Sequence, residues 1–389
     1  MVNEEKFTVI EEELEDIEIK SRVQIKEQMV KFYHRITSST KNFIDYQIPS
    51  AGNNLKTWVK SFRGSVILFC MLMVIIIPML LNDGTYYGIF IVAMIYSIYA
   101  ASWDLLAGVT GQVSFGHSAF FGIGSYAFAY FLIAFQLHWL VAILFSAIIT
   151  VVIGLIIAIP ALRLKGPYLA LGTMAFSLLL YYLFQFPELQ AESIDLPLAF
   201  KIFRWTNPLT IFLIVLIFMI ICVIIMLIVY NSKLGTIFKG IRDDEYATEA
   251  SGINTTKYKL YSFIISSFFA GIAGSLYAFH LGNVSFHNYS NLLSFYPVIF
   301  TLLGGIATIS GAVMGAFTFA ILTQAISELM GFFSGIFPFL PPAFTTQIET
   351  ISVFIFAIIL LLIIRFTERG VMEPAIRHTK SLWDILLGK

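Results

Sequence analysis

The chain has 389 residues, of which 58% are hydrophobic and only 12% are charged, and its mean hydropathy is +0.84. Soluble domains of ordinary composition carry about twice that charged fraction, so the composition excludes an average soluble enzyme and indicates a polytopic membrane protein. The formal net charge is zero, which provides no general attraction for nucleic acid or for an acidic partner surface.

Residues 1–63 differ in character from the rest and are predicted to form an N-terminal arm in the cytoplasm. The arm is strongly acidic over residues 4–18 and basic over residues 20–63. It has no short apolar run followed by small residues, so we expect it not to be a signal peptide. The spacing of its apolar side chains is compatible with an amphipathic helix, and a partly disordered tail fits the composition equally well.

Residues 64–366 form the predicted membrane domain, which is all-α and polytopic. A transmembrane helix needs about 20 consecutive apolar residues, and by this criterion the domain holds about ten transmembrane helices, some broken or re-entrant. Candidate spans lie near residues 65–81, 86–106, 112–134, 139–162, 167–186, 208–230, 259–280, 294–309, 311–334 and 346–365. The eighth of these is short, so a full crossing and a re-entrant half-helix both remain open. Residues 367–389 follow as a cytoplasmic tail.

The basic residues between the spans predict the orientation. Lys and Arg gather before the first span, between the fourth and fifth, between the sixth and seventh, and after the tenth. With ten spans all of these groups fall on one side, which the positive-inside rule makes the cytoplasm. We therefore expect a multi-pass protein of the cell membrane with both termini cytoplasmic.

The stretch 108–118 interrupts the apolar pattern with glycine and polar residues. Exposing such groups to lipid is costly, so they must be buried in protein or line a wet cavity. Interrupted helices at membrane depth are how transporters build solute sites, although glycines also allow helices to pack closely. The candidate solute-pathway residues here are Gly111, Gln112, Ser114, Gly116, His117 and Ser118.

A second glycine-rich stretch, 303–316, contributes further candidates for the solute pathway. They are Gly304, Gly305, Thr308 and Gly311. Ala307, Gly311 and Gly315 recur at every fourth residue and predict one smooth helix face. Small residues repeat in the same way in the seventh span, and close helix packing is the favoured interpretation of both patterns.

Ionisable residues within the spans are few, and each is a functional candidate by default. Glu328 and His117 are favoured, because Asp104 and Glu349 can sit at a membrane interface instead.

The segment 235–258 carries a cluster of charges on the predicted cytoplasmic side. The charges are followed by Gly252, which suggests a short helix ended by a glycine. Acidic residues early in that helix would suit its dipole. The residues singled out in this segment are Arg242, Asp243, Asp244, Glu245, Glu249, Ala250 and Gly252.

Several segments resemble the permease family of ABC importers for branched-chain amino acids, a family that also includes permeases for urea and short amides. The segments are GQVSFGHSAFFGIGSY at 111–126, RLKGPYLALGTMAF at 163–176, GTIFKGIRDDEYATEASGINTTKYKL at 235–260 followed by FFAGIAGSLYA at 268–278, and LLGGIATISGAVMGA at 302–316. They follow the family's order along roughly the whole membrane domain. The segment at 235–260 is the most specific, because it is similar to the family's EAA-type coupling loop.

The resemblance implies a permease subunit of an ATP-driven importer, with a cytoplasmic coupling loop at 232–258. It implies that residues 243–252 dock onto a cytoplasmic ABC ATPase subunit. It also implies a second, related permease chain and an extracytoplasmic solute-binding protein, with ATP and Mg held by the ATPase subunits and no cofactor in this chain. Departures at 187–200 and at Ala312 leave the solute open between branched-chain amino acids and urea or short amides.

Known catalytic and metal-binding motifs are missing from the sequence. Without a G-x-x-x-x-G-K-[ST] loop the chain is not expected to hold ATP phosphates. It has no H-E-x-x-H, C-x-x-C or G-x-S-x-G motif, and its two cysteines lie in apolar runs, so neither a metal site nor a catalytic residue is expected and ATP hydrolysis is assigned to partners.

Two functions of other classes remain as alternatives. A secondary transporter or channel independent of ATP would be favoured by paired intramembrane carboxylates. An intramembrane enzyme would use Ser118 with His117 or His280, but neighbouring residues on a helix do not face each other, which disfavours the first of these pairs.

Overall fold

The computed structural model describes residues 84–164, 166–186, 193–197 and 208–336, together with the isolated positions 78, 354, 358, 361 and 365. All of them belong to the compact unit Leu55–Lys389. The predicted arm at 1–63 and tail at 367–389 lie outside the described residues, as do nearly all of the predicted first and tenth spans.

The described residues form long helices and one small antiparallel sheet. In chain order the elements are α4 (Gly84–Asp104), the π-helix η2 (Leu105–Val109), α5 (His117–Ala134), α6 (Trp139–Ala161), α7 (Pro167–Gln185), β1 (Ser193–Asp195), α9 (Pro208–Asn231), α10 (Lys233–Asp243), α11 (Glu245–Ala250), α12 (Thr255–Leu281), β2 (Asn283–Ser285), the 3₁₀ helix η4 (Phe286–Tyr289), α13 (Asn291–Gly304) and α14 (Ile309–Ile336). In the sheet, Ile194 lies opposite Val284.

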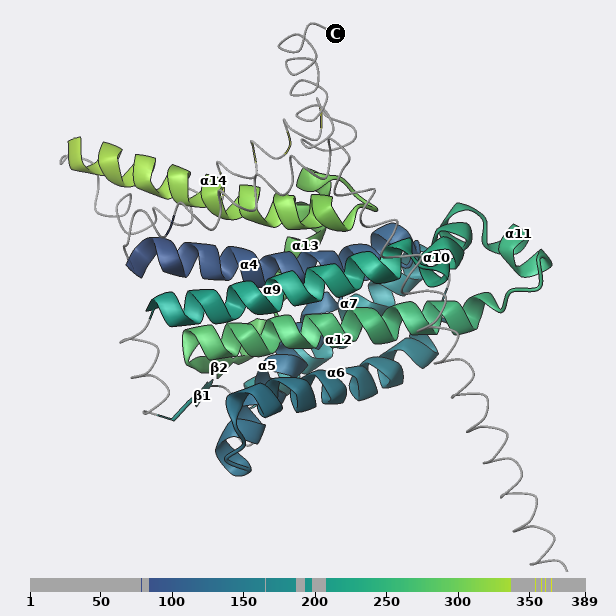
Figure 1. The fold of residues 1–389 in the computed structure, drawn as a ribbon, viewed down its shortest axis with the longest axis horizontal. Helices are drawn as coiled ribbons and strands as arrows, with labels where there is room; N and C mark the ends of the chain where they lie inside the picture. The colour runs from purple at the N-terminus through teal and green to yellow at the C-terminus, as the bar shows by residue number, and fades with distance from the viewer. Residues whose placement is uncertain are drawn as a thin grey trace, which may run out of the picture. The chain divides into compact units, whose positions relative to one another are not determined.

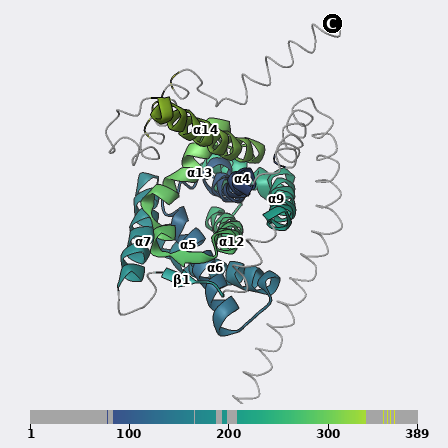
Figure 2. The same ribbon diagram turned by 90° about the vertical axis from the view of Figure 1, so that its left-hand side faces the viewer.

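The long helices run side by side as a bundle (Figure 1). Viewed end-on, α4 and α12 lie at its centre and α6, α7, α9 and α14 lie around them (Figure 2). The burial of the helices agrees with this view. In the most apolar stretch of α4 and η2, 89% of the residues are buried inside the protein, but in that of α7 only 28% are. The outer helices therefore present apolar side chains outward, as membrane helices do.

Seven of the predicted spans coincide with helices that are long and apolar enough to cross a membrane. The predicted eighth span corresponds to the shorter apolar helix α13. The described residues of the membrane domain are mainly helical, as predicted, with one small sheet that was not predicted. The total of ten helices stays a prediction.

The segment 282–308 contains the predicted eighth span. It starts beside the sheet, where the amide of Leu196 donates to the carbonyl of Gly282 at 3.0 Å. It ends beside Asp104, at the end of the bundle that carries α10. The segment thus crosses the whole bundle, first as β2 and η4 and then as the short helix α13.

The third predicted span begins later than expected. Residues 112–116, predicted as helix, are irregular, and α5 starts at His117. Two glycines explain the difference. Gly111 has a φ of +76°, which ends a helix. Gly116 lies so close to the carbonyl of Thr173 that a Cβ would collide with it.

Small residues of the seventh span pack closely against neighbouring helices, as the sequence indicates. Gly274 lies on the Phe121 carbonyl of α5, and Gly271 lies on the Thr150 side chain of α6. A Cβ at either glycine would clash, so the absence of a side chain at these positions lets α12 pack closely against α5 and α6.

Candidate functional site

The first break separates α4 from α5, and several of its polar groups have hydrogen-bond partners within the protein. The Trp103 indole donates to the carbonyl of Ser114 at 2.7 Å. The backbone amide of Gln112 donates to the carbonyl of Leu106 at 3.0 Å, and the Thr110 hydroxyl donates to the carbonyl of Leu105 at 3.0 Å. Irregular backbone at membrane depth is tolerated only with such internal partners.

His117 lies at the start of α5 with its side chain fully buried. Its Nε2 is 3.0 Å from the Ser102 hydroxyl, and that hydroxyl donates its hydrogen to the Tyr99 carbonyl at 2.7 Å. Nε2 must therefore carry the proton in this hydrogen bond. The ring also packs against those of Tyr99 and Phe120.

Ser118 belongs to a different polar cluster. Its Oγ accepts from Ser294 at 2.6 Å and lies 3.0 Å from the Ser177 hydroxyl. It also lies 3.1 Å from the Tyr289 carbonyl, to which it can donate. Neither His117 nor His280 bonds to it, so the described structure gives no support to a serine nucleophile paired with a histidine base.

The second break joins α13 to α14. Gly305 has a φ of +118° and Ala307 a φ of +62°, and the Thr308 hydroxyl donates to the Gly305 carbonyl at 2.7 Å. The prediction that Ala307 shares a helix face with Gly311 and Gly315 is wrong, because Ala307 precedes α14 and has a left-handed backbone. The two glycines do pack against α13, on the backbone of Gly304 and Phe300.

Asp104 connects the two breaks. Its Oδ1 accepts a hydrogen bond from the amide of Ala307 at 2.7 Å, and its side chain is fully buried. Asp104 is therefore enclosed by protein, and its place at a membrane interface stays a prediction. Glu328, favoured over it from the sequence, is exposed and accepts a hydrogen bond at 3.0 Å from Gln324 on the same helix.

The charged segment after α9 consists of two short helices rather than one. Arg242 and Asp243 end α10, and α11 begins only at Glu245. Asp244 separates them, because its φ of −156° is extended and its side chain caps α11 by accepting from the Ala247 amide at 3.0 Å. Such a cap begins a new helix.

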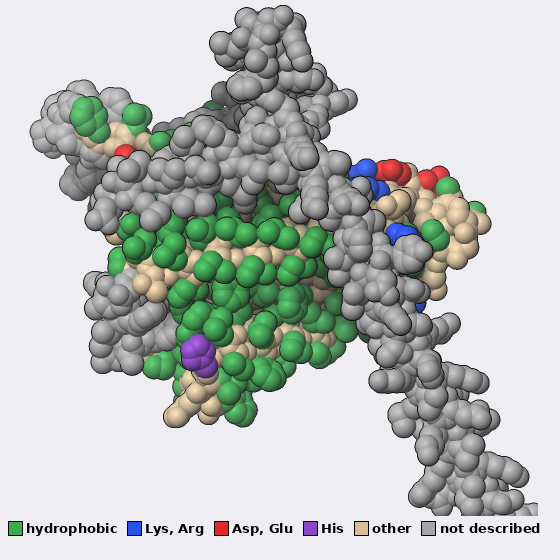
Figure 3. Space-filling view, viewed as in Figure 1, with side chains coloured by type: hydrophobic (Ala, Val, Ile, Leu, Met, Phe, Trp, Pro, Cys, Tyr) green, Lys and Arg blue, Asp and Glu red, His purple; other side chains and the backbone are tan. Residues whose placement is uncertain are grey.

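The two short helices project from one end of the bundle, where charged side chains gather (Figure 3). No residue of α11 is buried, and Gly252, with a φ of +82°, ends the segment as predicted. An ion pair of 2.6 Å joins Glu245 to Lys259 at the start of α12.

Lys239 of α10 lies over the ring of Tyr230, 3.6 Å from its centroid. Burial, and next the positive charge of Arg242, lowers the pKa of Lys239.

Arg242 brings this segment into contact with the first break. Its Nη1 donates to the carbonyl of Gly108 at 3.1 Å. Its Cα and Cγ lie 3.2 and 3.1 Å from the position that a Cβ on Gly111 would occupy. The segment predicted to couple and the stretch predicted to carry the solute are thus in direct contact.

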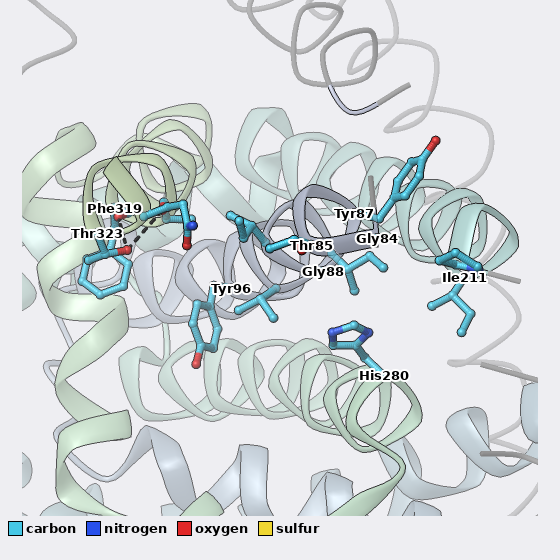
Figure 4. Close-up of a pocket in the computed structure, with 15 residues that line it drawn as sticks. Gly84, Thr85, Tyr87, Gly88, Tyr96, Ile211, His280, Phe319 and Thr323 are labelled. Carbon is cyan, nitrogen blue, oxygen red and sulfur yellow. Dashed lines mark hydrogen bonds between the residues drawn. The ribbon is translucent and has the colours of Figure 1, made fainter. Parts of the chain in front are cut away.

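A cavity of about 710 Å³ lies near the other end of the bundle, between α4, α9, α12 and α14 (Figure 4). Its walls are mainly apolar and aromatic, with neutral polar groups such as Thr323. His280 reaches toward α4 from α12 (Figure 4). A Cβ built on Gly84 or Gly88 would meet no atom within 4 Å, so these glycines leave the cavity wide.

The structure gathers the predicted residues into two places but does not test their roles. The predicted pathway residues lie at the two breaks, and the predicted coupling residues lie in α10, α11 and the turn that follows. None of the predicted pathway residues lines the cavity. A sequence signal for the cavity existed in Gly84 and Gly88, which lie one helical turn apart.

Comparison with known proteins identifies the family. Residues 85–365 match the family described as branched-chain amino acid transport system / permease component. The chain is 24% identical over 294 residues to the high-affinity branched-chain amino acid transport system permease protein LivM of Salmonella typhimurium, covering 68% of each chain. It is 24% identical over 281 residues to the LivM protein of Escherichia coli, covering 65% of each.

The chain thus spans about two thirds of the length of these relatives. No solved structure matches it significantly. Because the family match extends from the first turn of α4 to residue 365, it includes both breaks, the charged segment and the cavity. The chain belongs to the family of permease components of branched-chain amino acid transport systems.

Proposed function

We propose that the chain forms part of the solute pathway of an ATP-driven importer for branched-chain amino acids and couples that pathway to ATPase subunits. Its family membership supports the transport role. The observation that carries the coupling role is the hydrogen bond from Arg242 to the carbonyl of Gly108. It attaches the projecting charged segment to a broken helix in the bundle.

The coupling surface is α10, α11 and the turn to α12, within the predicted loop 232–258. Arg242, Asp243, Asp244, Glu249, Ala250 and Gly252 are exposed there. ATP and Mg, bound by the ATPase subunits, would close those subunits on each other and move α10. That movement drives transport only if ATP binding favours one conformer of the permease.

The orientation follows from the same assignment. The end of the bundle with α10 faces the cytoplasm, and both termini lie on that side. The opposite end then faces an extracytoplasmic binding protein. A second, related permease chain completes the membrane part, and the outer helices α6 and α7 offer apolar surfaces to lipid or to that chain, including Ile156 and Leu171.

The cavity between α4 and α12 would admit solute at the external end. Solute sites are commonly concave, mainly apolar and fitted with a few polar groups. Ile91 and Ile211 offer apolar surface to the aliphatic side chain of an amino acid. Thr85 and Thr323 place neutral polar groups in the same wall, where the polar end of the amino acid can bind. This lining favours a branched-chain amino acid over urea, which has no apolar part.

A secondary transporter independent of ATP is the second candidate. It would use intramembrane carboxylates to carry a proton or sodium ion. Asp104, a fully buried carboxylate, instead binds the backbone of the second break, so this observation favours a structural use of the charge.

Uptake in vesicles tests the proposal. The chain is reconstituted with its second permease chain and ATPase subunits, and uptake of leucine, isoleucine and valine is compared with that of urea. We expect uptake of the three amino acids that requires both ATP and the binding protein. Uptake of urea alone would overturn the solute assignment, and uptake without ATP would favour the secondary transporter.

A further inference from the structure

We infer that Asp104 is a positioning residue that ties the second break to the first, so that a movement of α10 reaches both. The inference rests on the proposed function, because it concerns how the coupling movement spreads within the chain. It adds a residue outside the predicted pathway and coupling sets.

The hydrogen bond from Ala307 to Asp104 holds an unfavourable backbone conformation. Ala307 has a φ of +62°, which costs free energy for any residue that carries a Cβ. The carboxylate oxygen accepts the amide of that same residue at 2.7 Å. A carboxyl oxygen is a good acceptor for a backbone amide, so the Asp104 side chain is suited to hold the break in this shape.

Gly108 places the coupling contact one helical turn from Asp104. The carbonyl of Gly108 accepts from Arg242 at 3.1 Å. A Cβ on Gly108 would collide with Asp104 Oδ1 and would lie 2.7 Å from the Ala307 amide nitrogen. One turn of chain therefore touches both the coupling helix and the second break, and any shift of Gly108 must also move the carboxylate or the Ala307 backbone.

The turn itself has a geometry that can change. Residues 105–109 form a π-helix directly after Asp104, and such segments occur frequently at functional sites. Asp104 Oδ2 is buried, and the described residues give it no hydrogen-bond partner.

Ser97 provides a matched control for a purely structural role. It is also a buried polar residue of α4, and its hydroxyl lies 3.4 Å from the carbonyl of Val313 in α14 and donates to Ala93 at 2.8 Å. Ser97 thus contacts α14, the helix that follows the second break, but it lies in neither break. A residue that only helps α4 and α14 to pack should behave like Ser97.

The test compares Asp104→Ala, Asp104→Asn and Ser97→Ala in the complete complex, with leucine uptake and ATP hydrolysis measured in the same vesicles. We expect Asp104→Ala to assemble and hydrolyse ATP but to transport roughly tenfold less leucine per ATP, within the usual range of coupling between sites. Asp104→Asn should restore the ratio to within about twofold, because its amide oxygen can accept the same hydrogen bond. Ser97→Ala should leave it unchanged.

Ala307→Gly examines the same link from the second break. Glycine tolerates the positive φ, so this variant should assemble normally even where Asp104→Ala does not. It lowers the cost of the conformation that Asp104 maintains and keeps the amide that the carboxylate binds. We therefore expect the double variant Asp104→Ala with Ala307→Gly to recover part of the leucine per ATP that Asp104→Ala loses.

Unchanged uptake per ATP in Asp104→Ala would overturn the inference, as would an equal loss in Ser97→Ala. If Asp104→Ala fails to assemble, the double variant with Ala307→Gly is measured instead, and unchanged uptake per ATP in it overturns the inference. Failure of the proposed function looks different, because the unvaried complex would then hydrolyse ATP without transporting any amino acid. If that complex transports urea, the same ratio is measured with urea.

Discussion

Arg242 and Gly108 lie 134 positions apart in the chain, and the arginine donates a hydrogen bond of 3.1 Å to the glycine carbonyl. The carbonyl belongs to the π-helix that ends α4, and the arginine belongs to the last turn of α10. A charged segment outside the bundle is therefore attached to the backbone of its most buried helix.

Removing the arginine side chain tests this attachment. In Arg242→Ala the Gly108 carbonyl loses its charged donor while the helices keep their packing. We expect ATP-dependent uptake to fall roughly tenfold, corresponding to about 1.4 kcal/mol of coupling free energy, with normal recovery of the complex. Lys257→Ala, at an exposed basic residue of the same end, is the control, and an equal loss there would assign the effect to surface charge.

The ion pair between Glu245 and Lys259 predicts a charge-reversal rescue. The pair is 2.6 Å long and fixes α11 to the start of α12. Glu245→Arg places two cations together, so α11 should detach and ATP-linked uptake should be lost in a folded protein. Adding Lys259→Glu should restore much of the uptake. A double variant as inactive as the single one would show that the charge of Glu245 serves another contact.

Gly111 is predicted to tolerate no side chain. Its φ of +76° costs a residue with a Cβ about 1 to 2 kcal/mol, and the added atom would press on Arg242. Gly111→Ala should lower the thermal unfolding midpoint by a few degrees and reduce uptake. Gly84→Ala, which meets open space, should leave the unfolding midpoint unchanged, and a similar drop of the midpoint in both variants would contradict this account.

Filling the cavity should block entry of solute without disturbing the fold. Gly88→Phe adds a ring where no atom lies within 4 Å of the Cβ position. We expect strongly reduced leucine uptake with unchanged assembly, and a much smaller effect for Gly88→Ala. Ile217→Phe adds bulk on an exposed face of α9 and serves as the control. Full uptake by Gly88→Phe would remove the cavity from the pathway.

The sequence located the helices well because membrane spans are set by local apolar length. It also indicated both breaks, since glycine and polar residues within a span are visible locally. The end of the segment at Gly252 was visible for the same reason. Asp244, an acidic cap preceding a helix-forming run, could have revealed that two helices and not one fill this segment.

The importance of Asp104 could not be predicted in this way. Whether a carboxylate near the end of a span is buried depends on what packs against it, and here that is Ala307, 203 positions later. The left-handed backbone of Ala307 was equally hidden, because an alanine spaced four residues before Gly311 fits a regular helix. The cavity arises from the arrangement of several helices, so the spacing of Gly84 and Gly88 indicates a smooth helix face but not what lies opposite it.

The most direct test of the coupling claim is purification of the tagged, full-length chain from its native membrane under gentle conditions, followed by mass spectrometry. We predict that ATPase subunits and a second permease chain are recovered with it, and that the ATPase subunits are lost when residues 243–252 are replaced. Repeated recovery of the chain alone, under conditions that keep other ABC complexes intact, would contradict the account.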